Sequence, residues 1–314
     1  MRGAADSPAG TVALPAKLAF VIAASIIPAA LAGILLIGYD YYDRERSRLE
    51  RDATATTRAL VAAVDAELTG ARAALLVLAT SPHLASGDLA AFHAQARAVM
   101  KHQAFFNIIL ADKSGLQLVN TLRPLGAPLP AQGDPGGLLR VFKTGQPVIS
   151  DLFVGRVSQE PVIGIGVPVD LGGKVRYALN GGISPGRLSL LISERRLSPG
   201  WLAGIFDRTG TIVARSHEAL LFVGKPGAPD LVRKMKELPE AAFESRTLEG
   251  IATLTVFSRS PVSGWTVAIG IPQRELTAHL LTSLARLFLV AFIVLAAALG
   301  GAIFIGRRVM AAGP

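Results

Sequence analysis

An uncharged apolar segment runs from Leu18 to Tyr39 and limits what the rest of the chain can form. As a helix its 22 residues would rise about 33 Å, at 1.5 Å per residue, which matches a hydrocarbon core of about 30 Å. Pro28 lies inside the segment, and membrane helices accommodate proline because neighbouring groups re-satisfy the freed backbone. The segment therefore predicts a transmembrane helix.

A cleaved signal peptide is the alternative for this segment. Lys17 precedes the apolar run, and Ala30-Leu31-Ala32 before Gly33 has the small residues of a cleavage site. The run continues beyond that site to Tyr39, which is long for a signal peptide. The length favours a retained anchor.

A second uncharged segment, Leu287 to Ile305, has the same character and is followed by Arg307 and Arg308. Two spans put both chain ends on one side, and the basic residues beside them predict that this side is cytoplasmic. The predicted order is a cytoplasmic tail (1–17), a span (18–39), an extracytoplasmic domain (40–286), a span (287–305) and the cytoplasmic start of a signalling linker (306–314).

The composition narrows the classes of partner and site. The chain has no cysteine, so it has no disulfide, thiolate metal site or cysteine nucleophile. Its net charge of +9 is dispersed rather than gathered in a basic run, which argues against nucleic acid and fits a surface close to an anionic lipid bilayer.

Residues 41–80 predict one long helix, because the stretch has no proline and only one glycine, Gly70. Leucine, valine and alanine recur along it at helical spacing from Leu60 to Leu78. This apolar stripe can pack on the chain's own domain or on the same helix of a second copy, so a homodimer is one of two expectations. Asp88 is placed to cap a second helix over residues 89–102.

The rest of the middle segment reads as two related modules. A strand-like run over 104–110, a turn at 112–115 and a returning strand over 116–120 are followed, roughly 95 residues later, by the same order over 201–206, 207–210 and 211–214. Further strand patterns occupy 148–154, 161–169 and 175–183 in the first module and 241–248, 251–261 and 265–271 in the second, with helices near 188–196 and 229–238. About five strands per module, mostly joined by short turns, predict an α+β fold with antiparallel sheets.

This arrangement resembles the double Cache sensor domain of bacterial transmembrane receptors. The resemblance covers about Tyr41 to Glu275 and rests on the long outgoing helix, the two modules that each open strand-Asp-x-Ser/Thr-Gly-strand, and the return to a second apolar segment. It implies two tandem PAS-like modules, a distal one at about 88–187 and a proximal one at about 198–272, stacked on the helix and flanked by two transmembrane helices. It also implies a bacterial inner-membrane location with a periplasmic central domain, and a small ligand (an organic acid, amine or amino acid) bound mainly in the distal module.

One departure from the family concerns the ligand. The amino-acid-binding subgroup carries a Tyr…Arg-x-Trp-Tyr pattern before its pocket, and this chain lacks it: Trp201 and Trp265 both fall in the second module.

No motif of catalysis or cofactor binding is present, so we expect no catalytic residue, cofactor or metal. Gly172-Gly173-Lys174 is followed by Val175 rather than by the Ser or Thr of a phosphate-binding loop. Gly164-Ile165-Gly166 lacks the third glycine of a dinucleotide fingerprint and indicates a close-packed strand instead. The five histidines show no metal-ligand spacing, and both Asp-x-Ser/Thr-Gly turns are interpreted as structural.

Candidate ligand contacts are the polar residues that interrupt or flank the apolar strands of the first module, because a ligand's polar groups need fixed partners. Arginine suits a carboxylate, to which it donates two parallel hydrogen bonds. The candidates are Asn107, Arg123, Asp151, Arg156, Tyr177 and Asn180. For Asn107 and Asn180 a solvent-facing position is the alternative, and for Arg156 a plain turn.

The predicted function is transmembrane sensing, with a ligand that shifts the population between two packings of the sensor. The expected output is a histidine kinase of a two-component system, in a protein that continues beyond Pro314. Alternatives are a chemoreceptor, a diguanylate cyclase, a stand-alone membrane-anchored binding or scaffolding protein, and a membrane enzyme with an unrecognised site. His279 lies outside the cytoplasm on the predicted topology, so it is no phosphoacceptor.

Overall fold

The computed structural model describes residues 13–131, 133–195, 197–275, 285–294, 296–297, 300–301 and 304. Helix α1 (Ala13–Ala79) extends over 67 residues. The chain separates into two compact units, one made of Met1–Leu49 with Gln273–Pro314 and one made of Glu50–Pro272. In the first unit, Arg44 forms an ion pair of 2.7 Å with Asp40 one turn earlier on α1.

The two predicted membrane spans stay predictions. The backbone of residues 18–39 is helical as part of α1, but most side chains of that segment, and several residues of 287–305, lie outside the described part of the chain. The linker expected at 306–314 also lies outside it. In the part that is described, no helix combines the length and the apolar character that a membrane crossing requires.

The first sheet of the second unit has five strands, all paired antiparallel, in the order β2-β1-β5-β4-β3. Its strands are β1 (Asn107–Ala111), β2 (Gln117–Asn120), β3 (Val148–Val154), β4 (Pro161–Asp170) and β5 (Val175–Ile183). The helices of this part are α2 (Pro82–Ser86), α3 (Leu89–Met100) and α4 (Pro135–Thr144).

The second sheet repeats this topology in the order β7-β6-β10-β9-β8. Its strands are β6 (Leu202–Phe206), β7 (Ile212–Arg215), β8 (Glu240–Arg246), β9 (Ala252–Arg259) and β10 (Thr266–Pro272), and the helices are α5 (Pro185–Glu194), α6 (Ala219–Phe222) and α7 (Pro229–Glu237). The register matches as well, because Asn107 pairs with Gly182 in the first sheet as Leu202 pairs with Gly270 in the second. The predicted internal repeat and α+β class are therefore confirmed.

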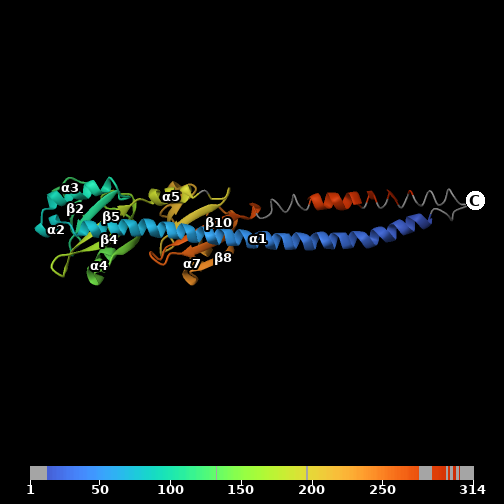
Figure 1. Cartoon of the computed structure of the whole chain (residues 1–314), viewed down its shortest axis with the longest axis horizontal. Helices are drawn as coiled ribbons and strands as arrows, with labels where there is room; N and C mark the ends of the chain where they lie inside the picture. Colours follow the sequence, from blue (N-terminus) through green and yellow to red (C-terminus); the bar gives the residue numbers. More distant parts are fainter. Residues whose placement is uncertain are drawn as a thin grey trace, which may run out of the picture. The chain divides into compact units, whose positions relative to one another are not determined.

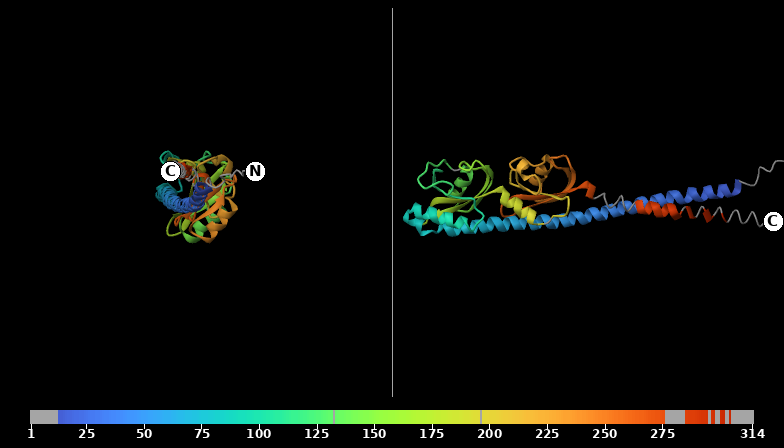
Figure 2. Two further views of the ribbon diagram at one scale, coloured as in Figure 1. Left: turned by 90° about the vertical axis from the view of Figure 1, so that its right-hand side faces the viewer. Right: turned by 90° about the horizontal axis from the view of Figure 1, so that it is seen from above.

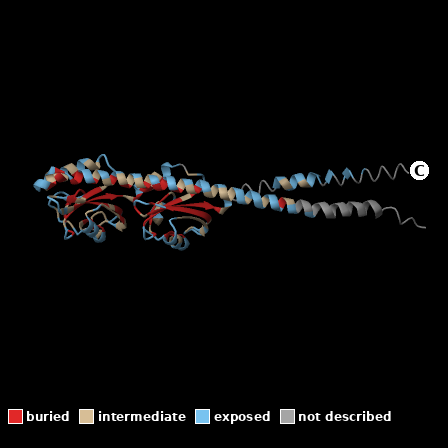
Figure 3. Cartoon of the chain, turned by 60° about the horizontal axis from the view of Figure 1, so that its bottom comes forward, coloured by how far each residue is buried: buried red, intermediate tan, exposed pale blue. Residues whose placement is uncertain are grey.

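From Glu50 onward, α1 runs along both sheets (Figures 1 and 2). Its side chains Leu60, Val64, Leu68 and Leu75 are fully or almost fully buried, and the strands of both sheets carry many further buried residues (Figure 3). A Cβ atom placed on Gly181 would lie 3.0 Å from Leu75, so the helix contacts β5 closely. The apolar stripe thus packs within the chain, and the homodimer stays a prediction.

Both Asp-x-Ser/Thr-Gly turns have the structural role that the sequence indicates. Asp112 accepts hydrogen bonds at one carboxylate oxygen from the backbone N–H groups of Ser114 and Leu116, and Asp207 accepts them from Thr209 and Thr211. The glycine that ends each turn has φ near +90°, a conformation that glycine adopts without steric cost. Each turn joins the first two strands of its sheet in a hairpin.

Helix α4 is an element that the sequence analysis does not predict. Its first turn carries Gly136 and Gly137, and because glycine is a poor helix former, the sequence there does not indicate a helix. The structure shows why glycine is there: the Asp134 carboxylate caps the helix by accepting from the Gly137 N–H at 2.9 Å, and a Cβ atom on Gly137 would overlap that carboxylate.

Candidate ligand-binding site

A small cavity lies on the first sheet, on the face opposite α1. Successive side chains of a strand point to opposite faces. Gly181 of β5 faces Leu75 of α1, so its neighbour Gly182 faces the other way, toward Asn107. The cavity on that side has a volume of about 30 Å³, and we call it the distal pocket.

The strands and one loop supply the walls of the distal pocket. Asn107 and Ile109 come from β1, Asn180 from β5 and Phe153 from β3. The loop after β3 contributes residues 155–158, including Arg156 and Ser158. Strands β2 and β4 contribute as well, so a bound molecule would touch all five strands of the sheet and the loop after β3.

Asn107 is the most informative residue of the pocket. Its side chain is only 6% exposed, and its Oδ1 atom has no hydrogen-bond partner. Leaving a buried acceptor unsatisfied costs about 1–3 kcal/mol. Asn180, 8% exposed, instead donates from Nδ2 to the carbonyl of Ala178 at 3.3 Å. A ligand that donates a hydrogen bond to the unpaired oxygen of Asn107 would therefore remove this cost.

Glycines on the central strands make room for these two amides. A Cβ atom on Gly166 would lie 2.7 Å from Oδ1 of Asn180, and one on Gly182 would overlap Oδ1 of Asn107. The amide side chains therefore lie flat across the strands and line the pocket floor. This confirms that Gly164-Ile165-Gly166 belongs to a close-packed strand.

The structure brings three of the six predicted contacts together: Asn107, Arg156 and Asn180 line the distal pocket. The other three lie elsewhere. Arg123 is exposed after β2, where its carbonyl bonds to the ring of His93. Asp151 forms an ion pair with Arg208 of the second sheet's first turn, and Tyr177 lies near the guanidinium of its neighbour Arg176.

Several residues that line the distal pocket were not predicted from the sequence. Gln117 and Asn120 of β2 line the pocket and bond to each other, with Nδ2 of Asn120 donating to Oε1 of Gln117 at 2.8 Å. Their three-residue separation on a short strand gave no sign that they share a site. Phe153 lines the pocket as well, but an aromatic residue in an apolar strand looks like an ordinary core residue.

Strand β3 also joins the distal pocket to the second sheet. Next to the pocket residue Phe153, the N–H of Leu152 donates to Oδ2 of Asp207 at 3.1 Å. Oδ1 of Asp151 accepts from the backbone N–H and Nε of Arg208, at 3.1 and 2.9 Å, and Nη2 of Arg208 donates to the carbonyl of Ile149. One strand therefore contacts both the pocket and the turn between β6 and β7.

The groups that line the distal pocket suit noncovalent binding of a small molecule. The pocket offers amide oxygens and nitrogens, one guanidinium and apolar walls, which fix and orient a small polar molecule. Within the described residues, no group of three or more His, Asp or Glu side chains is arranged to hold a metal ion.

Comparison with known proteins gives a match in solved structures alone: no family model matches the chain, and no curated protein does. The extracellular domain of the candidate histidine kinase rpHK1S-Z16 is similar to this chain with a TM-score of 0.61 at 15% identity, over 74% of this chain and 98% of that one. The ligand-binding domain of the Pseudomonas fluorescens chemoreceptor CtaA, solved with L-isoleucine, has a TM-score of 0.57 at 14% identity, over 76% and 98%.

A further similar structure is the ligand-binding domain of the Campylobacter jejuni chemoreceptor Tlp3, solved with L-valine, with a TM-score of 0.56 at 16% identity over 75% and 97% of the two chains. At these identities the likeness establishes the fold. All three are sensor or ligand-binding domains of signalling receptors.

Proposed function

We propose that this chain, whose fold is that of a double Cache sensor domain, detects a small ligand outside the cytoplasm and signals across the membrane. The observation that supports this most is the unpaired, buried Oδ1 of Asn107 in the distal pocket. The apolar segments 18–39 and 287–305 would carry the signal to a cytoplasmic output. The segment 287–305 follows the second sheet in the chain.

The ligand class follows from the polar groups of the distal pocket. Oδ1 of Asn107 needs a donor, which an ammonium group supplies, and Arg156 offers donors to a carboxylate. A molecule that carries both groups is an amino acid. The cavity of about 30 Å³ compares with the 10–15 Å³ that one water needs, so the ligand is compact.

The similar receptors support this class, since CtaA and Tlp3 are solved with amino acids bound. This chain lacks the tryptophan pattern of the amino-acid-binding subgroup. The proposal therefore rests on Asn107 and Arg156 and not on that pattern.

Strand β3 gives the ligand a route to the second sheet. A ligand that moves Phe153 or the loop over 155–158 also moves Leu152 and Asp151, which are bonded to the Asp207 turn. The ligand shifts the population only as far as it binds one arrangement better than the other.

For the output we propose a histidine kinase of a two-component system, because the extracellular domain of rpHK1S-Z16 has the highest TM-score of the three, 0.61. A chemoreceptor output is the second candidate, since the CtaA and Tlp3 domains score 0.57 and 0.56.

Binding is tested on the purified chain by calorimetry with L-alanine, propionate and ethylamine. We expect saturable binding of L-alanine and at least tenfold weaker binding of the two fragments, because each lacks one of the two charged groups. Arg156→Gln should weaken L-alanine binding at least tenfold, and Asn107→Leu should do the same.

Arg123→Gln is the matched control, since Arg123 is exposed after β2, as Arg156 is exposed after β3, but Arg123 does not line the pocket. It should leave the affinity within twofold. If no small amino acid binds, or if Arg123→Gln weakens binding as much as Arg156→Gln does, the proposed pocket is wrong.

A further inference from the structure

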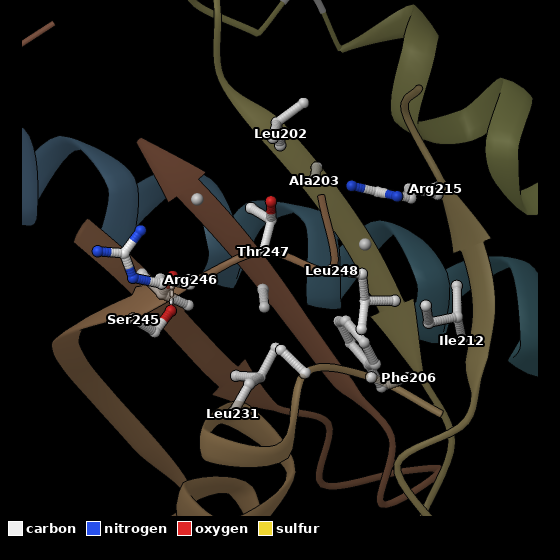
Figure 4. A pocket seen from close by; sticks show the side chains of 16 residues that line it. Leu202, Ala203, Phe206, Ile212, Arg215, Leu231, Ser245, Arg246, Thr247 and Leu248 are labelled. Carbon is white, nitrogen blue, oxygen red and sulfur yellow. Dashed lines mark hydrogen bonds between the residues drawn. The ribbon is translucent and has the colours of Figure 1, made fainter. Parts of the chain in front are cut away.

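The second sheet carries its own cavity at the place that corresponds to the distal pocket. It has a volume of about 70 Å³, larger than the 30 Å³ of the distal pocket, and we call it the proximal pocket (Figure 4). The correspondence follows from the strand register: Asn107 pairs with Gly182 as Leu202 pairs with Gly270, and Ile109 pairs with Asn180 as Gly204 pairs with Ala268.

The same positions carry different chemistry in the two pockets. Where the distal pocket has Asn107 and Asn180, the proximal pocket has Leu202 and Ala268. On the second strand of each hairpin, Ile212 takes the place of Gln117, and Arg215 takes the place of Asn120, at the same distance from the turn glycine. The proximal pocket is therefore a mainly apolar chamber whose lining includes two arginines, and of these Arg215 is the buried one.

Two contacts hold the guanidinium of Arg215 in place, and one of its nitrogen atoms has no hydrogen-bond partner. It is 8% exposed, its Nη2 contacts the carboxylate of Glu249 at 2.6 Å, and its guanidinium lies 4.3 Å from the ring centroid of Phe222. Its Nη1 atom is buried without a hydrogen-bond partner. Figure 4 shows the guanidinium directed from β7 across the chamber toward Ala203 and Thr247.

The charges around the chamber favour an anion. Arg246 lines it and Lys225 lies over the ring of Phe222, so together with Arg215 they set three cations against Glu249. Below the guanidinium in the view of Figure 4, Phe206, Ile212 and Leu231 supply apolar wall. An occupant that satisfies both ends has an acidic head and a hydrocarbon tail.

We propose that the proximal pocket is a second ligand site, which binds a short-chain carboxylate with its head on Nη1 of Arg215 and its tail between Phe206, Ile212 and Leu231. The two modules, which share one fold, would then bind different molecules. This site stands independently of the distal one, because no residue lines both pockets.

The test uses n-butyrate, with n-butyramide and n-butylamine as probes of the same length, on the full chain by calorimetry. Butyrate should bind saturably, and the amide and amine should bind at least tenfold more weakly. Arg215→Gln should weaken butyrate binding at least tenfold, which is the loss of one charge-assisted hydrogen bond of about 1.4 kcal/mol. Arg215→Lys, which keeps the charge, should recover part of that loss.

Ala268→Val covers the case in which Arg215→Gln disturbs folding. It leaves Arg215 in place and fills the chamber from the sheet, and it should also weaken butyrate binding at least tenfold. Thermal unfolding without ligand checks that each variant is folded. Asn107→Leu, the distal variant, should leave butyrate binding within twofold.

Any of three results would overturn the proposal. The first is that butyrate does not bind at all, and the second is that its binding survives both Arg215→Gln and Ala268→Val in folded protein. The third is butyrate binding that Asn107→Leu abolishes, which would place the carboxylate in the distal pocket. Failure of L-alanine to bind would count against the distal site alone.

Discussion

Gly115 and Gly210 occupy the same place in the two repeated turns, yet they have different surroundings. Both have a positive φ, +87° and +89°. A Cβ atom on Gly115 would lie 3.6 Å from Leu138, an ordinary contact, whereas one on Gly210 would lie 2.8 Å from Val232 of α7. The first glycine is needed for its conformation alone, and the second also for space.

This pair gives a matched prediction for stability. Gly115→Ala should lower the free energy of unfolding by about 1–2 kcal/mol, the cost of a left-handed conformation for an L-residue. Gly210→Ala should cost about 1–3 kcal/mol more, because the added methyl group overpacks against Val232. Urea unfolding of both variants measures the difference. Equal losses of stability would show that Val232 of α7 moves aside at no cost in free energy.

Glu240 predicts a pH dependence of stability. Hydrogen bonds from Arg58 of α1, at 2.8 and 2.6 Å, are the largest cause that holds the pKa of the Glu240 carboxyl below its ordinary value, against the effect of burial. The unfolded chain therefore binds this proton more readily than the folded one. The contribution of Glu240 to stability is present above the ordinary carboxyl pKa of about 4.3 and is lost as the pH falls through the lower folded pKa.

Glu240→Gln should remove this part of the pH dependence. The melting temperature of the unaltered chain should fall faster than that of the variant as the pH drops below about 4.3. Glu237→Gln, at a more exposed carboxylate on α7, serves as the control. If the unaltered chain and the Glu240→Gln variant lose stability in parallel, the ion pair does not hold α1 on β8.

Half of the predicted contact residues line the candidate site, and the reason is the range of the interactions. Asn107 and Asn180 break apolar strands whose faces alternate, so their positions could be inferred locally. Asp151 looked equivalent, but its partner Arg208 lies 57 residues further on, across the contact between two sheets. The pattern within one strand carries no information about such a partner.

Strand positions were predictable within about two residues in most cases, because glycines and prolines in the turns mark where the strands begin and end. Strand β3 was predicted over 148–154, the range observed. Helix α4 was not predicted, since the glycines that its Asp134 cap requires weaken the helical pattern. Helix α5 begins at Pro185, three residues before the predicted start.

The contact between β3 and the Asp207 turn predicts energetic coupling between the sheets. The Asp151 and Arg208 side chains are each about one-third exposed, 32% and 34%, so a double-mutant cycle with alanine at both should give a coupling of about 0.2–1 kcal/mol. Thermal or urea unfolding of the four proteins measures it. Strictly additive losses would mean that this ion pair does not link the sheets.

For the whole molecule, the sequence predicted the repeat and its fold, because both modules carry the same order of strands and turns. It could not reveal the proximal pocket, which is formed by apolar residues that resemble core positions and by Arg215, a charged residue at the end of a strand. The correspondence between the two pockets follows from the matching strand registers of the two sheets.

A ligand in the distal pocket should act on the second sheet through β3. Hydrogen exchange of the full chain, with and without L-alanine, tests it most directly. We expect slower exchange in the pocket loop over 155–158, at Leu152 and in the turn over 207–211, and we expect Asn107→Leu to remove all three effects. Protection that leaves the loop and Leu152 unchanged, or that persists in Asn107→Leu, would contradict it.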